Sequence, residues 1–479
     1  MTIAELQAIV PLLPEVFLAV AAMVLLLVGV FRDGSGGGPI TPLAILVLIA
    51  TLVLVLLSAP GVQSHFGGAV VDDAFSRFMK ALILAASAIA LVLAPDFMRR
   101  EGFYKFEYAV LMLLSTAGMM LMVSANDLMA MYLAIELTSL PLYVAAAMHR
   151  DNLRSSEAGL KYFVLGALSS GMLLYGCSLI YGYTGSTSFT QIAAVLQAGA
   201  PAIGMIFGLV FVLAGLAFKM SAVPFHMWTP DVYEGAPSPV TAFFAAAPKI
   251  AAIALLTRLV FDAFPALGKE WGQIVIAIAV GSMALGAFAA IGQRNIKRLM
   301  AYSSIGHVGY ALIGLAAGTP EGVQGVAVYL AIYAAMTLGT FAFITGLRRA
   351  DKPVETIDEL SGYSRSEPMM ALIFAVLLFS LAGIPWMAGF FAKFYVFRAA
   401  IDAGLYWLAV IGVLASVIGA YYYLRIVKVM YFDEPRAAFD DMAPPVKAVF
   451  VLSGLFVFFY VLVPGPLVEQ AAVAAKALF

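Results

Sequence analysis

The feature that most limits how this chain can fold is a series of long, uncharged apolar runs that recurs from one end to the other. Of the 479 residues, 63% are hydrophobic and 11% are charged, whereas a soluble domain is about 45–50% apolar and about 25% charged. Backbone polar groups inside a bilayer must pair within the fold, which leaves helices or a closed barrel. The runs are continuous rather than alternating, so a barrel is excluded. The sequence therefore predicts an all-α polytopic membrane protein.

Division into runs of roughly 20 apolar residues predicts about 14 membrane-spanning helices, with little chain left for a soluble domain. The start of the chain lacks the basic region of a cleaved signal peptide, so we expect the first run to be a retained span. The predicted spans are 12–30, 40–58, 74–94, 107–125, 128–148, 157–182, 203–230, 238–261, 271–292, 297–316, 323–346, 367–398, 405–430 and 446–464.

The Lys and Arg residues of the short loops gather on one side of these spans, which the positive-inside rule assigns to the cytoplasm. The other side holds mainly Arg77, Lys80 and Lys269. Both termini are then predicted on the side away from the cytoplasm, which is the periplasmic side where the membrane is a bacterial inner (plasma) membrane. The residues of the basic side are Arg32, Arg99, Arg100, Lys105, Arg150, Arg154, Arg294, Lys297, Arg298, Arg348, Arg349, Lys352, Lys428 and Arg436.

Two predicted spans contain helix-breaking residues close to a lysine. Lys219 precedes Pro224 in the seventh span, and Gly383-Ile-Pro385 precedes Lys393 in the twelfth. The two breaks lie five spans apart, and an odd offset reverses orientation, which is the pattern of an inverted-repeat transporter. We expect peripheral helices in 1–104, one five-helix repeat in 105–265, its inverted copy in 266–435, and a last helix with a tail in 436–479. The alternative is that these prolines are ordinary membrane-helix prolines.

Four charged residues lie near the middle of a predicted span or beside a predicted break: Glu136, Lys219, Lys249 and Lys393. Each charge at a helix centre costs roughly 2.5–3.5 kcal/mol, so pairing, hydration or neutralisation must offset on the order of 10 kcal/mol. Burial disfavours the charged form and an opposite charge restores it, so near-balance lets such a group gain and lose a proton. The four residues are therefore predicted to form a proton relay. The plainer alternatives are structural hydrogen bonds or ion pairs, and snorkelling for Lys393.

Two further residues join the predicted relay. Lys161 lies about one turn into its helix and either snorkels or pairs with Glu136 or Lys219; His307 lies near mid-span and is either a titrating group or a satisfied core histidine. By contrast, Arg258, Arg425 and Lys428 lie near span ends and are expected to be interfacial anchors.

Several classes of function find no support in the sequence. The single cysteine, Cys177, cannot form a disulfide, a CxxC redox site or an iron–sulfur site. No phosphate-binding loop of the G-x-x-x-x-G-K-[ST] type occurs, no His or Cys cluster has metal-ligand spacing, and no basic tract suggests nucleic-acid binding. Any electron transfer is therefore expected in a partner.

Five motifs give the chain a family resemblance. From about residue 105 to 430, in order, they resemble motifs of subunit N of NADH-quinone oxidoreductase, the respiratory complex I. The multisubunit sodium/proton antiporters share some of them more loosely. The motifs are Glu136-Leu-Thr-Ser-Leu-Pro-Leu-Tyr143, Leu160-Lys-Tyr-Phe-Val-Leu-Gly166, the stretch from Phe218 to Pro237, the stretch from Asn295 to His307, and Gly383-Ile-Pro with Gly389-Phe-Phe-Ala-Lys-Phe394.

The resemblance implies a subunit that couples NADH-to-quinone electron transfer to outward proton movement. It implies no cofactor in this chain, with NADH, FMN, iron–sulfur clusters and quinone bound by other subunits, and other membrane-arm subunits as partners. It places the family's key residues at Glu136, Lys161, Lys219, Lys249 and Lys393, and less firmly at His307. We expect Glu136 to pair with Lys161 and Lys219, and protons to pass through Lys249 and His307 to Lys393. A sodium/proton antiporter subunit and a purely structural subunit are the alternatives.

Overall fold

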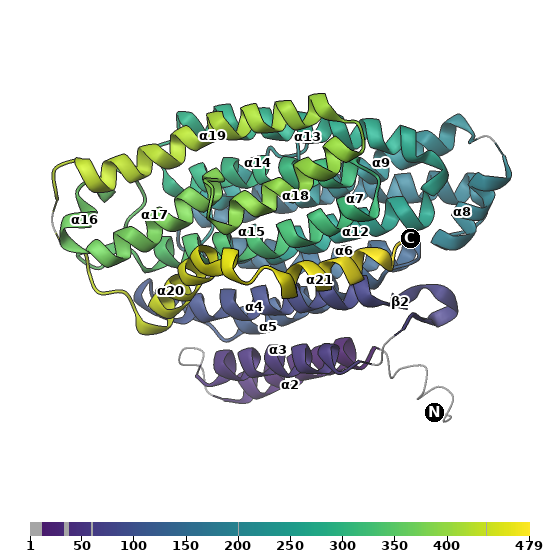
Figure 1. Ribbon diagram of the computed structural model, residues 1–479. Coiled ribbons are helices and arrows are strands. Elements are labelled where there is room, and N and C mark those ends of the chain that lie inside the picture. The colour runs from purple at the N-terminus through teal and green to yellow at the C-terminus, as the bar shows by residue number, and fades with distance from the viewer. Residues whose placement is uncertain (1–11, 33–37, 59–60, 200, 437) are drawn as a thin grey trace.

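The computed structural model describes residues 12–32, 38–58, 61–199, 201–436 and 438–479, and it is a bundle of helices (Figure 1). Three short helices, α8 (Phe189–Ala198), α10 (Thr229–Gly235) and α16 (Tyr363–Ser366), lie between the main ones. The main helices are α2 (Leu13–Phe31), α3 (Ile40–Leu56), α4 (Ala74–Arg100), α5 (Glu107–Ser124), α6 (Leu128–Ala146), α7 (Leu153–Thr184), α9 (Ile203–Met220), α11 (Ser238–Ala245), α12 (Ala247–Arg258), α13 (Gly268–Ile291), α14 (Ile296–Ala316), α15 (Pro320–Gly346), α17 (Pro368–Ala382), α18 (Ala388–Asp402), α19 (Tyr406–Phe432), α20 (Pro444–Phe459) and α21 (Gly465–Lys476).

The predicted all-α membrane fold is confirmed. Among the described residues, 12 helices are long and apolar enough to cross a membrane, and the shorter apolar helices α3 and α17 lie at the two remaining predicted positions. Some predicted boundaries were wrong. The span predicted to end at residue 94, just before Pro95, continues to Arg100, since neighbouring helices can satisfy the backbone groups that a proline frees in a membrane helix. Helix α21, which follows the last predicted span, was not expected.

Three helices are interrupted beside the lysines of interest. Helix α9 ends at Met220, followed by Ser221 with φ of +66°. Helix α17 ends at Ala382, followed by Gly383 with φ of +88°, and α18 begins five residues later. The third interruption was not predicted: the span expected at 238–261 divides at Ala246, two residues before Pro248. Proline cannot donate to the carbonyl four residues earlier, which accounts for that division.

Helices α2 and α3 form a pair at the outer edge of the bundle, where α3 packs on α4 and α2 on α5 (Figure 1). Helix α20 packs on α15 and α17, and α21 packs on α4 and α15. The last residue, Phe479, places its ring 4.7 Å from the ring of Phe261, in the π-helical segment η3 (Leu259–Ala263) that continues α12. The C-terminal segment therefore ties the first helices to the central ones.

One end of the bundle carries most of the basic loop residues, and we call it the basic end. Arg154 forms a 3.0 Å ion pair with Glu355, and Arg348 forms a 2.7 Å ion pair with Glu101. Two short strands, β3 (Arg348–Arg349) and β4 (Lys352–Pro353), pair antiparallel there. Loops from widely separated parts of the chain, which the count of Lys and Arg residues assigned to one side of the membrane, therefore lie next to one another in space.

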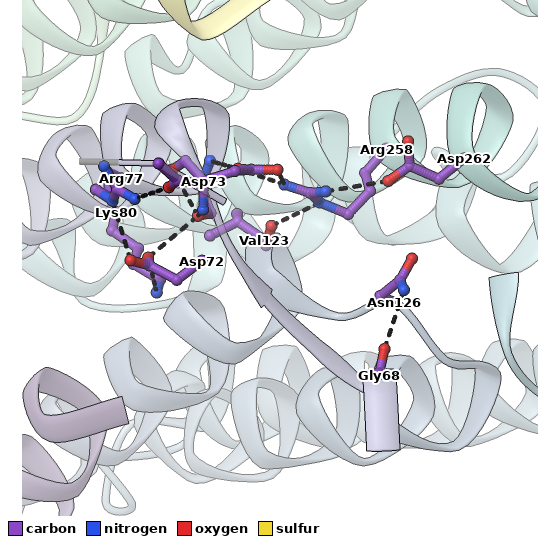
Figure 2. Close-up of polar contacts among 11 residues, drawn as sticks. Gly68, Asp72, Asp73, Arg77, Lys80, Val123, Asn126, Arg258 and Asp262 are labelled. Atoms are coloured by element: carbon purple, nitrogen blue, oxygen red, sulfur yellow. Dashed lines mark hydrogen bonds and ion pairs between the residues drawn. The ribbon is translucent and has the colours of Figure 1, made fainter. Parts of the chain in front are cut away.

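The opposite end, which we call the hairpin end, carries the antiparallel strands β1 (Gln63–His65) and β2 (Val70–Asp72). Just after the hairpin, Asp73 caps α4 by accepting a 2.7 Å hydrogen bond from the Ser76 amide. Figure 2 shows that Asp73 also accepts from Arg258, whose Nη2 lies 2.8 Å from both carboxylate oxygens. Arg258 further binds Asp262 at 3.0 Å.

The expectation that Arg258 is an interfacial anchor is therefore wrong. Its side chain is 2% exposed, and its Nε donates to the carbonyl of Val123 at 3.0 Å. A position near a span end suggested an interfacial anchor, but α4 packs against α12 here, and its capping residue Asp73 supplies the carboxylate. A second buried group lies beside it in Figure 2, where Lys80 is within 3.4 Å of Asp72. Glu15 of α2 also lies 2.7 Å from that ammonium.

Candidate functional site: a row of lysines and hydroxyls

Lys219 occupies the last turn of α9 and reaches across to α6. Its Nζ donates to Ser139 Oγ at 2.8 Å and to Tyr143 OH at 3.4 Å. The two hydroxyl residues lie four apart on α6, so they share one face of that helix. The C-terminal end of a helix carries partial negative charge, which favours a cation in the last turn. Lys219 is thus held by two neutral hydroxyls and a helix end rather than by a carboxylate.

Glu136 lies one turn earlier on α6, half-buried, and accepts a hydrogen bond from Ser170 of α7. Among the described residues, Glu136 forms neither of its predicted ion pairs, with Lys161 or with Lys219. Lys161 pairs instead with Glu157 and with Asp231, both at 2.7 Å. The Lys161 side chain is 41% exposed at the basic end. It lies near the start of α7, and its long stem extends towards Asp231 of helix α10. Of the two predicted alternatives for Lys161, the exposed position agrees with snorkelling.

Lys249 is 1% exposed and lies in the first turn of α12, directly after the division at Ala246. Its Nζ donates to Ser304 Oγ of α14, which also hydrogen-bonds Tyr333 OH of α15 at 2.6 Å. The ring of Tyr233 lies 5.5 Å from the ammonium. No carboxylate forms an ion pair with Lys249 in the described part of the chain.

His307 is 3% exposed in the middle of α14 and contacts two phenols. Its Nδ1 lies 2.6 Å from Tyr329 OH of α15, and its Nε2 lies 3.2 Å from Tyr423 OH of α19. A neutral imidazole has one donor and one acceptor nitrogen, and each phenol can take either role. His307 can therefore exchange donor and acceptor sides without losing a hydrogen bond.

Lys393 of α18 is 6% exposed and reaches back across the second predicted break. Its Nζ donates to the carbonyls of Leu381 and Ala382 at 3.2 and 2.9 Å and to Ser416 Oγ at 2.7 Å. The two carbonyls are the last of α17, left without helical partners by the break. The ring of Tyr310 lies 4.7 Å from the ammonium. Both predicted breaks thus place a lysine at the carboxyl end of a helix.

The structure arranges the predicted residues in two groups. The first polar group consists of Glu136, Ser139, Tyr143, Ser170 and Lys219. The second polar group connects Lys249 to Lys393 through hydroxyls and rings. Its members are Lys249, Ser304, Tyr333, His307, Tyr329, Tyr423, Tyr310, Ser416 and Lys393.

An aromatic segment separates the two polar groups. Tyr143 packs against Tyr162 at 4.8 Å, Tyr162 stacks on Trp228 at 4.4 Å, and Trp228 meets Tyr233 at 6.3 Å between ring centroids. Tyr233 then lies over Lys249. Hydrogen bonds therefore occur within each group, while aromatic rings in edge-on and stacked contact span the distance between Lys219 and Lys249.

The hydroxyl partners were missed when the sequence was read for charges alone. A signal was available, because Ser139 stands three residues after Glu136 and Ser304 three residues before His307. Residues three apart share a helix face. The tyrosines of α15 and α19 carry no such signal, since their contacts depend on how the helices pack. In the described part of the chain, no three His, Cys, Asp or Glu side chains come together as a metal site.

The fold is that of an antiporter-like membrane protein, and residues 125–419 match the family described as NADH:quinone oxidoreductase/Mrp antiporter, TM. Solved structures of this kind superpose on almost the whole chain. A chain of respiratory complex I from Thermus thermophilus with bound aureothin has a TM-score of 0.82 at 32% identity, covering 96% of this chain and 99% of that one. A chain of the Mrp complex from Dietzia sp. DQ12-45-1b has a TM-score of 0.83 at 24% identity, covering 100% and 98%, and shows the fold alone.

Sequence relatives give a narrower assignment. NADH-quinone oxidoreductase subunit N of Parvibaculum lavamentivorans is 59% identical over 478 residues, which is 99% of each chain. Subunit N 1 of Rhizobium meliloti is also 59% identical, over 98% of this chain and 97% of that protein. The chain belongs to the NADH-quinone oxidoreductase subunit N family.

Proposed function

We propose that this chain is a proton-translocating membrane subunit of an NADH:quinone oxidoreductase. The observation that carries the proposal is the pair of polar groups, in which Lys219, Lys249 and Lys393 are each held by neutral hydroxyls or carbonyls. A buried cation with a carboxylate partner is stabilised by a full opposite charge. Neutral partners stabilise it less, so the protonated and neutral forms lie closer in free energy. Such lysines can take up and release protons during turnover.

The helix ends stabilise the protonated form of some of these lysines and destabilise it in another. Lys219 and Lys393 contact the carboxyl ends of α9 and α17, which favour a cation by about 0.3–1 kcal/mol and up to ~2 kcal/mol when partly buried. Lys249 lies in the first turn of α12, where the same effect disfavours a cation. We infer that Lys249 releases its proton most readily of the three. A proton on Lys219 or Lys393 would raise the cost of a second one on Lys249.

Transfer between the groups would follow the order Lys219, Lys249, His307, Lys393, with Glu136 biasing the charge of Lys219 from α6. Lys249 to His307 has a short route, since Ser304 and Tyr333 connect Lys249 to the histidine ring at 5.2 Å between centroids. The aromatic segment before Lys249 interrupts the hydrogen bonds, so we infer that it opens to water during turnover. That opening would make the segment a gate between two half-routes.

The two half-routes correspond to the proposed inverted repeats, 105–265 and 266–435, with 1–104 and 436–479 as peripheral parts. Each proposed repeat contains one break with a lysine at a helix carboxyl end. We infer that the basic end faces the cytoplasm of a bacterial cell with an inner membrane, and that both termini face the periplasm. NADH, FMN, iron–sulfur clusters and quinone would be bound by other subunits of the complex.

The sodium/proton antiporter alternative would use the same lysines without a redox partner. It rests on a fold shared with the Mrp complex at 24% identity, whereas the relatives named for subunit N reach 59% over the full length. The redox-coupled role is therefore preferred. A purely structural subunit fits less well, because structural ion pairs need carboxylate partners, and the three buried lysines of the row form no ion pair with a carboxylate of the described residues.

A mild-detergent purification of this chain from its own membranes, assayed for inhibitor-sensitive NADH-to-quinone electron transfer, tests the proposal. We expect the activity and a set of redox subunits to copurify with the chain. Copurification of membrane subunits alone, without NADH oxidation, would instead support the antiporter role.

A further inference from the structure

Lys297, in the first turn of α14, is a buried cation that the relay described above does not use. Its side chain is buried, with 6% of the residue exposed. Within the described residues, its ammonium makes one hydrogen bond, to the carbonyl of Ala236 at 2.9 Å, and no ion pair. The amino end of a helix disfavours a cation, and burial adds to that cost. A position that only needed a donor for one carbonyl would be served by a neutral side chain.

The need to anchor α10 to α14 does not explain a charged residue at position 297, because the neighbouring Arg298 already provides that anchor. Arg298 binds Asp231 at 2.7 Å and Glu234 at 3.1 Å, so both acidic residues of α10 are tied to the start of α14. Lys297 instead binds the carbonyl of Ala236, the residue directly after α10. The charge of Lys297 therefore adds a cost without adding an ion pair.

A cavity of about 110 Å³ leads from the surface of the basic end to Lys297. At its rim lie Arg154 and Glu355, whose side chains are 64% and 41% exposed. Its inner wall is formed by buried residues, among them Ala236 and Lys297 itself. A cavity of this size with polar walls has room for several waters. The other ionisable groups that line it are Glu101, His149 and Glu234.

Two elements connect the inner end of the cavity with the surroundings of Lys249: helix α14 and the end of α10. On α14, Lys297 and Ser304 are seven residues apart, which places them on one face with a rise of about 10.5 Å between them. The end of α10 also touches both lysines, since the Ala236 carbonyl binds Lys297 and the Tyr233 ring lies over Lys249. The Tyr233 hydroxyl is buried and has no hydrogen-bond partner among the described residues. An unengaged hydroxyl on the tyrosine whose ring lies over Lys249 is suited to pass a proton to that lysine.

We propose that Lys297 is a proton-carrying residue that takes protons from the basic-end cavity and supplies them to Lys249. This inference rests on the proposed function. Neutral Lys297 gains a proton from cavity water, its ammonium releases one towards Tyr233 and Ser304, and the Lys249 amine takes one up. These steps return Lys297 to its neutral form and leave the proton on Lys249, so one proton moves from the cavity into the second polar group.

The test compares Lys297→Arg and Lys297→Gln in the assembled complex, in inverted membrane vesicles. Both replacements keep a donor for the Ala236 carbonyl, but arginine does not release its proton and glutamine has none to release. We expect both to lower the proton-to-electron ratio as much as Lys249→Ala does. The control Lys352→Gln, at an exposed lysine of the same end, should keep the wild-type ratio.

A wild-type ratio in Lys297→Arg would overturn the proposal and make Lys297 a fixed charge. If Lys249→Ala alone left the ratio unchanged while the Lys297 variants lowered it, the link to Lys249 would be wrong. If Lys249→Ala and both Lys297 variants all kept the wild-type ratio, the translocation role itself would fail together with this inference.

A second measurement applies even where those variants do not assemble. In a Cys177→Ser background, we expect a water-soluble methanethiosulfonate to label the Lys297→Cys variant at least tenfold faster than Ala301→Cys, one turn deeper on α14 and fully buried. Equal labelling rates would mean that water does not reach Lys297 through the cavity, and the proposal would be overturned.

Discussion

Loss of the Asp73 carboxylate should destabilise the bundle strongly, because two separate interactions depend on it. Asp73 caps α4 through the Ser76 amide, and loss of a cap costs about 1 kcal/mol. Removal of one partner of a buried ion pair costs about 3–5 kcal/mol, since the other charge is left uncompensated. Arg258 keeps Asp262 at 3.0 Å, so the lower end of that range applies. Asp73→Ala is therefore expected to lower the free energy of unfolding by about 4 kcal/mol.

A matched variant separates the two contributions, with unfolding measured on the purified chain in bicelles by steric trapping. Asparagine caps helices as well as aspartate does, so Asp73→Asn should keep the cap and lose about 3 kcal/mol. The double variant Asp73→Ala with Arg258→Met removes the uncompensated charge and should be more stable than Asp73→Ala alone. A loss of only about 1 kcal/mol in Asp73→Ala, with Asp73→Asn close to wild type, would refute the reasoning, because the cap alone would then account for it.

Two further predictions concern the basic end and the second break. Burial alone would raise the pKa of Asp231, but the hydrogen bond from Lys161 helps to outweigh it and holds that pKa below its ordinary 3.8. The Asp231 carboxylate therefore adds stability that is complete above about pH 4 and is lost as the pH falls through the lowered pKa. The difference in unfolding temperature between wild type and Asp231→Asn should then shrink at low pH. A difference that stays constant with pH would contradict this. In Gly389→Ala, the new Cβ would overlap the Ser380 carbonyl oxygen, so we expect a loss of about 1–3 kcal/mol in the free energy of unfolding by the same unfolding assay. Gly171→Ala is the control, because no atom of the described residues lies within 4 Å of its new Cβ apart from its own helix backbone and chain neighbours; equal stability of the two variants would refute the close contact.

Much of the fold could be predicted because each span must satisfy its own backbone in lipid. The breaks beside Lys219 and Lys393 could be seen from Pro and Gly residues, and the structure has helix ends there. The same reasoning applied to Pro248 would have found the third division, but an uninterrupted apolar run hid it. The position of Arg258 near a span end suggested an anchor, since a sequence does not show that α4 closes over it.

The charged residues of the site could be predicted from the sequence, whereas the side chains that hydrogen-bond them could not. A buried charge is costly enough to stand out in an apolar sequence, which is why Lys249 and His307 could be named. Their acceptors are hydroxyls on other helices, and serine or tyrosine in a membrane span is too common to carry a signal alone. The predicted pairing of Lys161 with Glu136 was wrong, because helix α10 brings Asp231 within 2.7 Å of Lys161.

The most direct test of the central claim is the proton-to-electron ratio of the assembled complex with Lys219→Ala. The assay would record proton uptake and NADH oxidation together in inverted vesicles, with the exposed Lys269→Ala as the control. The account predicts fewer protons moved per NADH in Lys219→Ala, at a normal level of assembled complex, and no change in Lys269→Ala. An unchanged ratio in the fully assembled Lys219→Ala complex would contradict it.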